Sequence, residues 1–252
     1  MNRTLFDRCV LSIGTFLAAL CFYNQGYSDW NYSFLQKENA REQISTPGFQ
    51  KLEASVINYL KNSWCSEEKT RLLMELVLLE KPSVCVEIGV FTGSSLLPVA
   101  ATLSYLHQGS VYAIDPWSNK EAIRNYTDSD PNVKWWAELN LDQVYRSFMQ
   151  TCAQWKIKPY CHVLKTTSQQ AVPEIGQIDF LHIDGNYSED SSLEDVALFA
   201  PKVRSGGYIL YSNFSWTVNG KQTRVLAFQK LLESCEIISI IDDRNSFLLR
   251  KF

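Results

Sequence analysis

The sequence predicts an α/β fold with a mostly parallel sheet and helices on both of its faces. Five short apolar runs, rich in Val, Ile and aromatic residues, alternate with segments of helical spacing. The first of these runs ends in a glycine-bearing turn that opens directly onto a helix. The last helix is followed by two further runs joined by a short polar turn, which predicts a closing hairpin.

The composition fits one such domain. The chain has 252 residues, of which 46% are hydrophobic and 20% are charged, and this length can bury a sizeable core. The net charge is -3, the pI is near 5.7, and no basic patch carries interleaved aromatic residues, so we expect no nucleic-acid partner. Seven cysteines are scattered without a C-x-x-C pair, and we interpret them as buried thiols rather than a disulfide framework or zinc site.

Residues 1–34 differ from the rest of the chain. Arg3 and Arg8 precede the uncharged stretch Cys9–Tyr23, which is typical of a signal peptide or signal anchor. The stretch is shorter than the roughly 20 residues that span a bilayer. Basic residues before an apolar run predict membrane association or export, with the domain on the non-cytoplasmic side. The alternative is a cytoplasmic protein whose N-terminal helix packs on the domain.

Residues 35–82 are expected to form N-terminal helices after a linker. The polar stretch 35–48 reads as the linker, and helical spacing covers Gln50–Lys61 and Glu67–Lys81. The second helix has one broad apolar face, formed by Leu72, Leu73, Leu76, Val77 and Leu79. We expect these helices to cover the sheet edge and to form the floor of a ligand pocket.

The first strand, its turn and the following helix start lie in Val84–Ser95 (VCVEIGVFTGSS). The strand carries the acid Glu87, the turn runs from Gly89 to Gly93, and the helix continues to about Gln108. Such a unit presents free backbone N–H groups and a positive dipole end, which can hold an anionic part of a ligand. The alternative is a plain connection. The spacing Glu-x-Gly-x-x-x-Gly differs from that of dinucleotide binders, which disfavours NAD.

The second strand and the segment after it follow from the same pattern. Strand Ser110–Asp115 ends in a carboxylate, which can accept hydrogen bonds from a ribose or can form a turn before the next proline. Residues 118–137 are a polar insertion that carries Tyr126, Trp135 and Trp136. The insertion is either a lid over a substrate or a surface loop whose tryptophans pack on the core. Helical spacing returns over Leu139–Trp155.

The third and fourth strands bring further polar residues to their ends. Strand Tyr160–Lys165 is followed by Ser168 and Gln169, and Ser168 is also a candidate helix N-cap. Strand Ile178–Asp184 is a near-continuous apolar run, which suits a central parallel strand, and Asp184 lies at its carboxyl end, where ligands bind in open α/β sheets. His182 shares the face of Asp184. We interpret it as a hydrogen-bonded core residue rather than a catalyst.

The remaining elements complete the predicted sheet. A helix over Ser191–Arg204 leads through two glycines into strand Tyr208–Asn213. An amphipathic helix covers Thr223–Ser234. The runs Glu236–Asp242 and Ser246–Arg250 form the closing hairpin.

These motifs resemble those of a known enzyme family. The run EIGVFTGSSLL resembles motif I of class I S-adenosylmethionine (SAM) dependent methyltransferases, especially the catechol and caffeoyl-CoA O-methyltransferases. The stretch HIDGNYSED is also similar to the macrocin O-methyltransferases. The resemblance covers residues 64–252. It implies a seven-stranded, Rossmann-like methyltransferase sheet with an antiparallel last strand, in a methyltransferase domain over 83–252.

The resemblance also implies a ligand-contact set. The residues that would line the methionine end of SAM are Glu87, Gly89, Phe91, Gly93 and Ser95. Asp115 would hold the ribose, and Ser168 with Gln169 would contact the adenine. The catalytic residues facing the methyl acceptor would be Asp184, Tyr187 and Asn213.

The acceptor end departs from the family. In the catechol-type enzymes a Mg²⁺-type cation is held by an Asp after strand four and an Asp-Asn pair after strand five, and a Lys acts as base. Here Asp184 and Asn213 match two of the metal ligands, but Ser212 replaces the second Asp and Tyr187 replaces the Lys. One carboxylate and one amide are a poor cage for a hard cation, so a divalent metal is disfavoured. Because a phenol has a pKa near 10, Asp184 is a better proton acceptor than Tyr187.

The predicted function is therefore SAM-dependent methylation, with a hydroxyl of a small molecule as the acceptor. The sulfonium methyl is already activated, so the protein must align the acceptor and exclude water. A SAM-binding protein without activity is one alternative, because charge has been lost at the acceptor end. A second is an NAD-dependent oxidoreductase on a similar sheet, and a third is a membrane-tethered interaction module without a small ligand.

Overall fold

The computed structural model describes residues 39–252. The predicted signal-anchor-like segment, with the apolar residues 9–23 proposed for membrane association, lies outside the described residues. Within 39–252, none of the helices combines the length and the apolar character that a membrane span requires.

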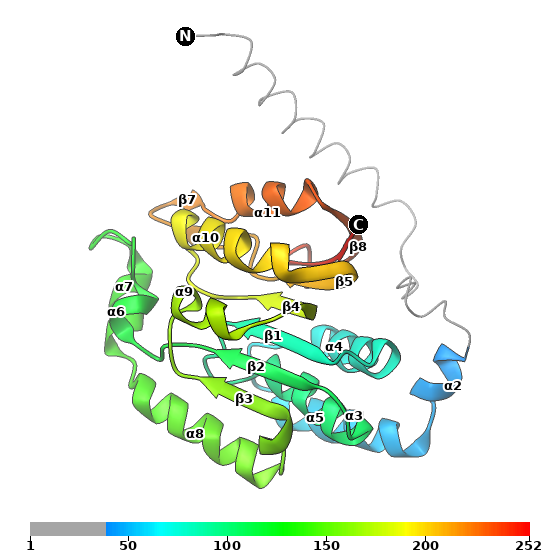
Figure 1. The fold of residues 1–252 in the computed structure, drawn as a ribbon. Coiled ribbons are helices and arrows are strands. Elements are labelled where there is room, and N and C mark those ends of the chain that lie inside the picture. The colour runs from blue at the N-terminus through cyan, green and yellow to red at the C-terminus, as the bar shows by residue number, and fades with distance from the viewer. Residues whose placement is uncertain (1–38) are drawn as a thin grey trace.

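A seven-stranded sheet lies at the centre of the molecule, in the order β3-β2-β1-β4-β5-β9-β8 (Figure 1). The strands are β1 (Val84–Ile88), β2 (Ser110–Ile114), β3 (Cys161–Leu164), β4 (Ile178–Ile183), β5 (Val203–Tyr211), β8 (Cys235–Ile241) and β9 (Ser246–Lys251). The strands β1 to β5 pair in parallel, and β9 runs antiparallel between β5 and β8. The predicted α/β fold with an antiparallel last strand is confirmed.

Helices cover both faces of this sheet (Figure 1). The α-helices are α2 (Ala40–Ile44), α3 (Pro47–Leu60), α4 (Glu67–Glu80), α5 (Leu96–Leu106), α6 (Asn119–Ala122), α7 (Pro131–Glu138), α8 (Leu141–Gln154), α9 (Ser168–Ala171), α10 (Glu189–Phe199) and α11 (Val225–Leu232). Short 3₁₀ turns occupy Lys158–Tyr160, Val172–Glu174 and Ala200–Lys202. The core on one face joins α3, α4, α5 and α8 to the sheet, and the core on the other face joins α10 and α11.

The two cores follow from the alternation of side chains along each strand. In β1, Cys85 belongs to the core under α4 and α5, whereas Val86 and Ile88 belong to the core under α10 and α11. The five cysteines within 39–252 are buried free thiols, as predicted for them. A sheet with apolar side chains on both faces needs helices on both sides, which explains the three-layer arrangement.

Several predicted boundaries were wrong, for local reasons. The expected linker over 35–48 contains α2, and Pro47 begins α3 rather than ending a linker, because proline is tolerated in the first helical turn. His107, with φ 55°, caps α5, so the expected glycine stop lies two residues beyond the cap. The helix predicted over Ser191–Arg204 runs instead from Glu189 to Phe199, and a proline follows closely.

The fifth strand is longer than expected. It begins at Val203 rather than Tyr208, so Gly206 and Gly207 lie inside the strand and not in a turn. The pairing with β4 shifts register between Ile178 and Phe180, and Gly206 has φ +72°. Both features indicate a bulge, which is a common place for glycine inside a strand.

A small hairpin outside the main sheet was not predicted. It consists of β6 (Thr217–Val218) and β7 (Lys221–Gln222). Asn219 at its tip accepts hydrogen bonds from the backbone N–H and the hydroxyl of Thr127, at 3.0 and 2.7 Å. The hairpin therefore holds the insertion 118–137 against the body of the domain.

Candidate active site

A cavity of about 460 Å³ opens at the carboxyl ends of β1, β2 and β4. Its walls come from the glycine turn after β1, the tip of β2, residues 167–169, residues 184–187 and the start of α4. This is the place where ligands bind in open parallel sheets, and the volume lies within the range of small-molecule sites. The predicted site residues converge here, with two exceptions described below.

The glycine turn is shaped by close backbone packing. Gly89 has φ +83°, and a Cβ at this position would lie 2.1 Å from the carbonyl oxygen of Asp184. Gly93 has φ +82°, and a Cβ there would lie 2.6 Å from the ring of Phe148. Only glycine satisfies both the left-handed conformation and the close approach at Gly89. The turn, which we call the glycine cradle, is therefore packed against the end of β4, and its residues 89–92 line the cavity.

Asp115 braces this cradle. Its Oδ2 accepts hydrogen bonds from the backbone N–H groups of Val90 and Phe91, both at 2.9 Å, and its Oδ1 accepts from the N–H of Trp117 at 2.6 Å. Burial raises the pKa of Asp115, and these backbone donors partly oppose the rise. Because a carboxylate has about four acceptor positions, Oδ1 keeps capacity for a ligand hydroxyl. Asp115 thus belongs to the turn and also faces the cavity.

Glu87 and Gly93 are the two predicted ligand contacts that do not line the cavity. Glu87 is 1% exposed, and its Oε1 accepts a 2.7 Å hydrogen bond from the hydroxyl of Ser95, which does line the cavity. Its Oε2 lies 3.3 Å from Nδ1 of His182. Glu87 points toward the face of the sheet that α4 covers. Its link to the cavity is its hydrogen bond with Ser95. Gly93 contributes shape to the turn instead.

The pair after β3 faces the cavity and α10. Ser168 donates from its hydroxyl to Oδ1 of Asp195 at 2.5 Å, and the Gln169 amide donates to Glu194. Burial raises the pKa of Asp195 to about 6. The N-cap of α9 is Thr167 and not Ser168, so the capping alternative for Ser168 is wrong.

Asp184, Tyr187 and Asn213 meet at the other end of the cavity. Oδ1 of Asp184 accepts from the Asn213 amide at 2.6 Å and from the Tyr187 hydroxyl at 3.2 Å. The amide also donates to the Tyr187 oxygen at 3.0 Å. Burial first, and then the charge of Asp184, raise the pKa of Tyr187 well above its usual value. The phenol is thus a hydrogen-bond donor here, which leaves Asp184 as the candidate proton acceptor.

These side chains do not fit a divalent cation. The Asn213 amide presents its N–H group to Asp184, and its oxygen accepts from Asn245 at 3.3 Å. Ser212, at the position of the missing Asp, turns its hydroxyl to Nε2 of His182 at 2.8 Å. Within 39–252 no cluster of three or more His, Cys, Asp and Glu residues could hold a metal. Asp184 and Asn213 contact each other where the metal alternative requires two free oxygen ligands.

His182 is fully buried between the two acids. Its Nε2 lies 3.9 Å from Oδ2 of Asp184, and its Nδ1 faces Glu87. The interpretation as a hydrogen-bonded core residue agrees with its contact to Ser212.

The insertion 118–137 forms part of the cavity wall. The Asn186 amide donates to three backbone carbonyls of the insertion, at 2.8, 3.1 and 3.2 Å, and so holds α6 beside the cavity. Trp136 lines the cavity and meets the Phe91 ring edge-on at 5.7 Å. Trp135 is 40% exposed and lies 5.3 Å from the Trp64 ring. Trp136 thus borders the cavity, as a lid would, whereas Trp135 packs on the exposed Trp64 and not on the core.

Sequence reasoning missed two buried cations. Arg224 is fully buried, donates to the carbonyl of Ile183 at 3.0 Å and lies over the ring of Tyr187 at 5.2 Å. Nothing in the sequence pattern marks it. Lys69 lines the cavity from α4 and is almost completely buried. The sequence could have indicated that Lys69 is buried, because helical spacing places it on the same face as Leu72, Leu73 and Leu76.

Comparisons with known proteins agree with this geometry. The O-methyltransferase NovP has a similar structure, with a TM-score of 0.56 and 17% identity over 73% of this chain and 78% of its own. The O-methyltransferase TomG from Streptomyces achromogenes, solved with SAM, gives 0.52 and 14% over 86% and 91%. An O-methyltransferase from Bacillus cereus, in complex with S-adenosylhomocysteine (SAH), gives 0.51 and 14% over 86% and 93%.

At these identities the likeness to solved structures establishes the fold. No curated protein matches the chain. The family described as "Methyltransferase domain" matches residues 86–214, which is slightly more than half of the chain and includes the glycine turn, Asp115 and the acceptor-end residues. The chain therefore belongs to this family of methyltransferase domains.

Proposed function

We propose that the protein is a SAM-dependent methyltransferase that methylates a hydroxyl of a small molecule. The observation that carries the proposal is the order of groups along one cavity. The Ser168–Gln169 pair, the carboxylate of Asp115, the glycine cradle and Asp184 line the cavity, and they follow β3, β2, β1 and β4, which are neighbours in this order in the sheet. The similar proteins from B. cereus and S. achromogenes, solved with SAH and SAM, support it as O-methyltransferases on the same fold.

The cavity fits this cofactor in its own side chains. Asp115 keeps an acceptor position for the ribose hydroxyls, and Ser168 with Gln169 contacts the adenine. Gly89 lets the turn pack closely against Asp184. Gly89, Phe91 and Ser95 line the cavity and would contact the methionine part. When bound, SAM supplies an activated methyl group.

The residues of the chain supply alignment and a proton acceptor. Asp184 is held in place by Asn213 and Tyr187, so that its carboxylate faces the cavity with a defined orientation. It orients the acceptor hydroxyl and takes its proton. Arg224 supports the Tyr187 ring from behind. Trp136, which lines the cavity beside Phe91, excludes water from the part of the cavity next to the glycine turn.

The domain division and the cellular location rest on the sequence alone. We propose a signal-anchor-like segment and linker over 1–34, N-terminal helices over 35–82 and the methyltransferase domain over 83–252. Membrane association through residues 9–23 is tested by fractionation of cells that express the full chain. Recovery in the membrane pellet after a high-salt wash supports it, whereas recovery in the supernatant contradicts it.

Calorimetry on the full-length protein tests the proposed cofactor. We expect heat of binding with SAH and none with NAD. Binding of NAD alone favours the oxidoreductase alternative, and binding of neither compound favours an interaction module. The inactive SAM-binding alternative is motivated by Ser212, which replaces a family carboxylate and turns away from the cavity. It is tested by measuring SAH release from SAM over a panel of catechols and other phenols, where binding without turnover supports it.

A further inference from the structure

Lys69 places a buried positive charge in the cavity wall. The side chain is only 6% exposed, yet Lys69 lines the cavity. Its nearest carboxylate oxygen is Oδ2 of Asp242 at 3.6 Å, beyond hydrogen-bond length, and within the described part of the chain its ammonium makes no closer ion pair. An ammonium has three donors. The ion pair with Asp242 leaves donors of this ammonium available, and burying unused donors is costly, so a ligand group is expected to meet them.

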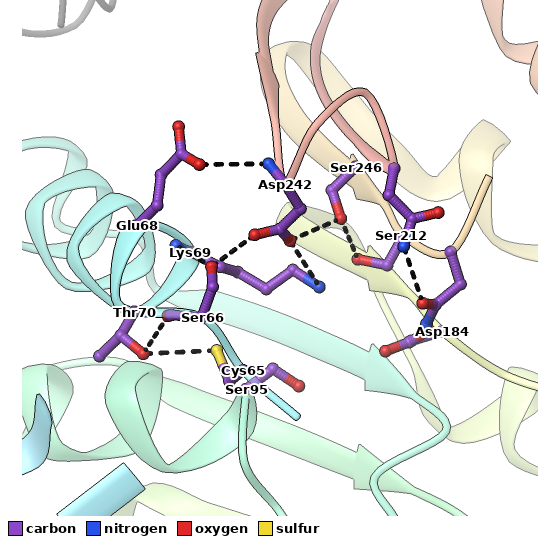
Figure 2. Close-up of polar contacts among 12 residues, drawn as sticks. Cys65, Ser66, Glu68, Lys69, Thr70, Ser95, Asp184, Ser212, Asp242 and Ser246 are labelled. Carbon is purple, nitrogen blue, oxygen red and sulfur yellow. Dashed lines mark hydrogen bonds and ion pairs between the residues drawn. The ribbon is translucent and has the colours of Figure 1, made fainter. Parts of the chain in front are cut away.

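Several hydrogen bonds hold Asp242 next to the ammonium of Lys69 (Figure 2). Its carboxylate accepts hydrogen bonds from the hydroxyls of Ser66 and Ser246, and its backbone N–H donates to Glu68 at 3.2 Å. Residues 242–244, in the turn between β8 and β9, have φ values of 53°, 50° and 69°. Three consecutive left-handed residues without glycine are unfavourable on their own, so these contacts hold the turn. The turn thus fixes the position of Lys69.

A row of polar side chains links this pair to the glycine turn. Glu87, His182, Ser212 and Ser246 come from, or directly follow, four neighbouring strands and contact one another in that order. Ser95 joins one end of the row through Glu87, and Asp242 joins the other end through Ser246. The row lies on the α4 face of the sheet. Burial raises the pKa of the Cys65 thiol, just before α4, and the charges of Lys69 and Glu87 both act on this pKa as well. Lys69 therefore lies on the side of the cavity that Glu87 and its partner Ser95 border.

The charges of the cavity wall support one ligand group for Lys69. Among the described lining residues, Lys69 and Arg124 are the lysine and arginine side chains. Arg124 is paired with Glu194 at 3.0 Å, next to Gln169, at the end proposed for adenine. The amino-acid part of the proposed cofactor carries an ammonium and a carboxylate. The acidic side chains that line the cavity can bind the ammonium. Because Arg124 is paired with Glu194, Lys69 is the lining cation available to the carboxylate.

We propose that Lys69, positioned by Asp242, binds the carboxylate of the cofactor's amino-acid part. This inference rests on the proposed function and adds a binding residue from outside the motifs that predict it. Lys69 is a binding residue and Asp242 is a positioning residue, so both act on affinity for ligands that carry the carboxylate.

Calorimetry with two ligands tests the role of Lys69. The full-length protein, Lys69→Met, Asp242→Asn and the control Lys230→Met are titrated with SAH and with 5′-methylthioadenosine, which lacks the amino-acid part. Lys230 lies on the exposed side of α11, where it pairs with Glu233. Because a hydrogen bond to a charged group contributes about 1.5–3 kcal/mol, we expect Lys69→Met to weaken SAH binding roughly 10- to 100-fold. Affinity for 5′-methylthioadenosine should change less than about twofold.

The remaining variants sharpen the test. Asp242→Asn should weaken SAH binding less than Lys69→Met does, and Lys230→Met should change neither ligand. Equal weakening of both ligands by Lys69→Met, or no weakening of SAH, overturns the inference. If the wild-type protein binds neither ligand, the proposed function itself fails, which is a distinct result.

A second measurement does not depend on how the variants fold. The wild-type protein is titrated with SAH and with its decarboxylated analogue, which keeps the ammonium and the nucleoside. We expect the analogue to bind at least about 10-fold more weakly, since it lacks the group that Lys69 contacts. Equal affinity for the two compounds overturns the inference.

Discussion

The two ends of β4 carry aspartates that are treated in opposite ways. Asp179, near the start of the strand, accepts a 2.6 Å hydrogen bond from Arg204 and two of 2.9 Å from the backbone N–H groups of Ser83 and Val84. Asp184, just beyond the other end, receives donors only from the neutral side chains of Tyr187 and Asn213 among the hydrogen bonds that the described chain gives it. At the edge of the sheet where the parallel strands begin (the amino edge), the carboxylate of Asp179 links neighbouring strands. At the edge where they end (the carboxyl edge), the carboxylate of Asp184 faces the cavity.

The pKa values of acids at the two edges of the sheet are shifted in opposite directions. Desolvation acts to raise the pKa of Asp179, but the hydrogen bonds from Arg204 and from Val84 and Ser83 outweigh it and lower the pKa. At the carboxyl edge, burial prevails over the backbone donors and raises the pKa of Asp115. The comparison teaches that Asp179, which is paired with a cation, is structural, whereas Asp115 and Asp184 receive these hydrogen bonds only from neutral groups beside a cavity and keep acceptor capacity for a ligand.

The largest effect at the carboxyl edge is expected from Gly89→Ala. The new Cβ would meet the Asp184 carbonyl at 2.1 Å, so the turn and the end of β4 must separate. We expect SAH affinity, measured by calorimetry, to fall at least about 100-fold and the melting temperature to drop.

Two glycines provide matched controls for this change. Gly176 has open space around it, and Gly220 has open space but φ +71°. Gly176→Ala should leave stability and SAH affinity almost unchanged, and Gly220→Ala should lower stability by about 1 kcal/mol through backbone strain alone. Normal SAH binding by Gly89→Ala would contradict the cradle.

The next largest effect concerns turnover at Asp184. Asp184→Asn removes the proposed proton acceptor and should lower kcat by about 100-fold or more. Tyr187→Phe should lower kcat by less than about 10-fold, because the raised pKa of Tyr187 keeps the phenol protonated and unable to act as base. SAH formation at saturating SAM, with an acceptor that the wild-type protein methylates, measures both. Equal losses in the two variants would contradict the assignment of Asp184 as the sole proton acceptor.

A smaller effect, confined to stability, is expected at the amino edge. Asp179→Asn should lower the free energy of unfolding by about 1 kcal/mol and leave SAH affinity unchanged. The folded pKa of Asp179 is lowered, so its stabilisation is complete above the unfolded value near 3.9 and is lost as the pH falls through the folded pKa. Denaturant unfolding of wild type and variant should therefore converge at low pH. A difference that persists at low pH, or a loss of SAH binding, would break the contrast between the two edges.

The smallest effect is expected from metal removal. Asn213 presents its amide N–H to Asp184, and Ser212 turns to His182, so the acceptor end offers too few free oxygens for Mg²⁺. Treatment with EDTA, or addition of Mg²⁺, should change the rate of SAH formation by less than about twofold. Loss of activity in EDTA that Mg²⁺ restores would show that these side chains rearrange around a cation.

The sequence by itself determined the order of elements, the glycine turn and the acids at the strand tips. These features depend on local chemistry. Apolar periodicity specifies strands and helices, and the glycine turn and the acids are recognised from their places directly after the strands. Because parallel strands end at one edge, Asp115, Ser168 and Asp184 could be placed around one cavity before any contact was known.

Only the tertiary structure decided which polar groups satisfy one another. From the sequence, Ser212 stands where the family has a metal-binding Asp, yet its hydroxyl contacts His182. From the sequence, Glu87 is a ligand contact, yet it is buried and hydrogen-bonded to Ser95. Lys69 reads as a helix residue, and its charge reaches the cavity because a turn near the other end of the chain brings Asp242 to it. Burial and hydrogen-bond pairing depend on atoms from distant parts of the chain, and no local spacing contains that information.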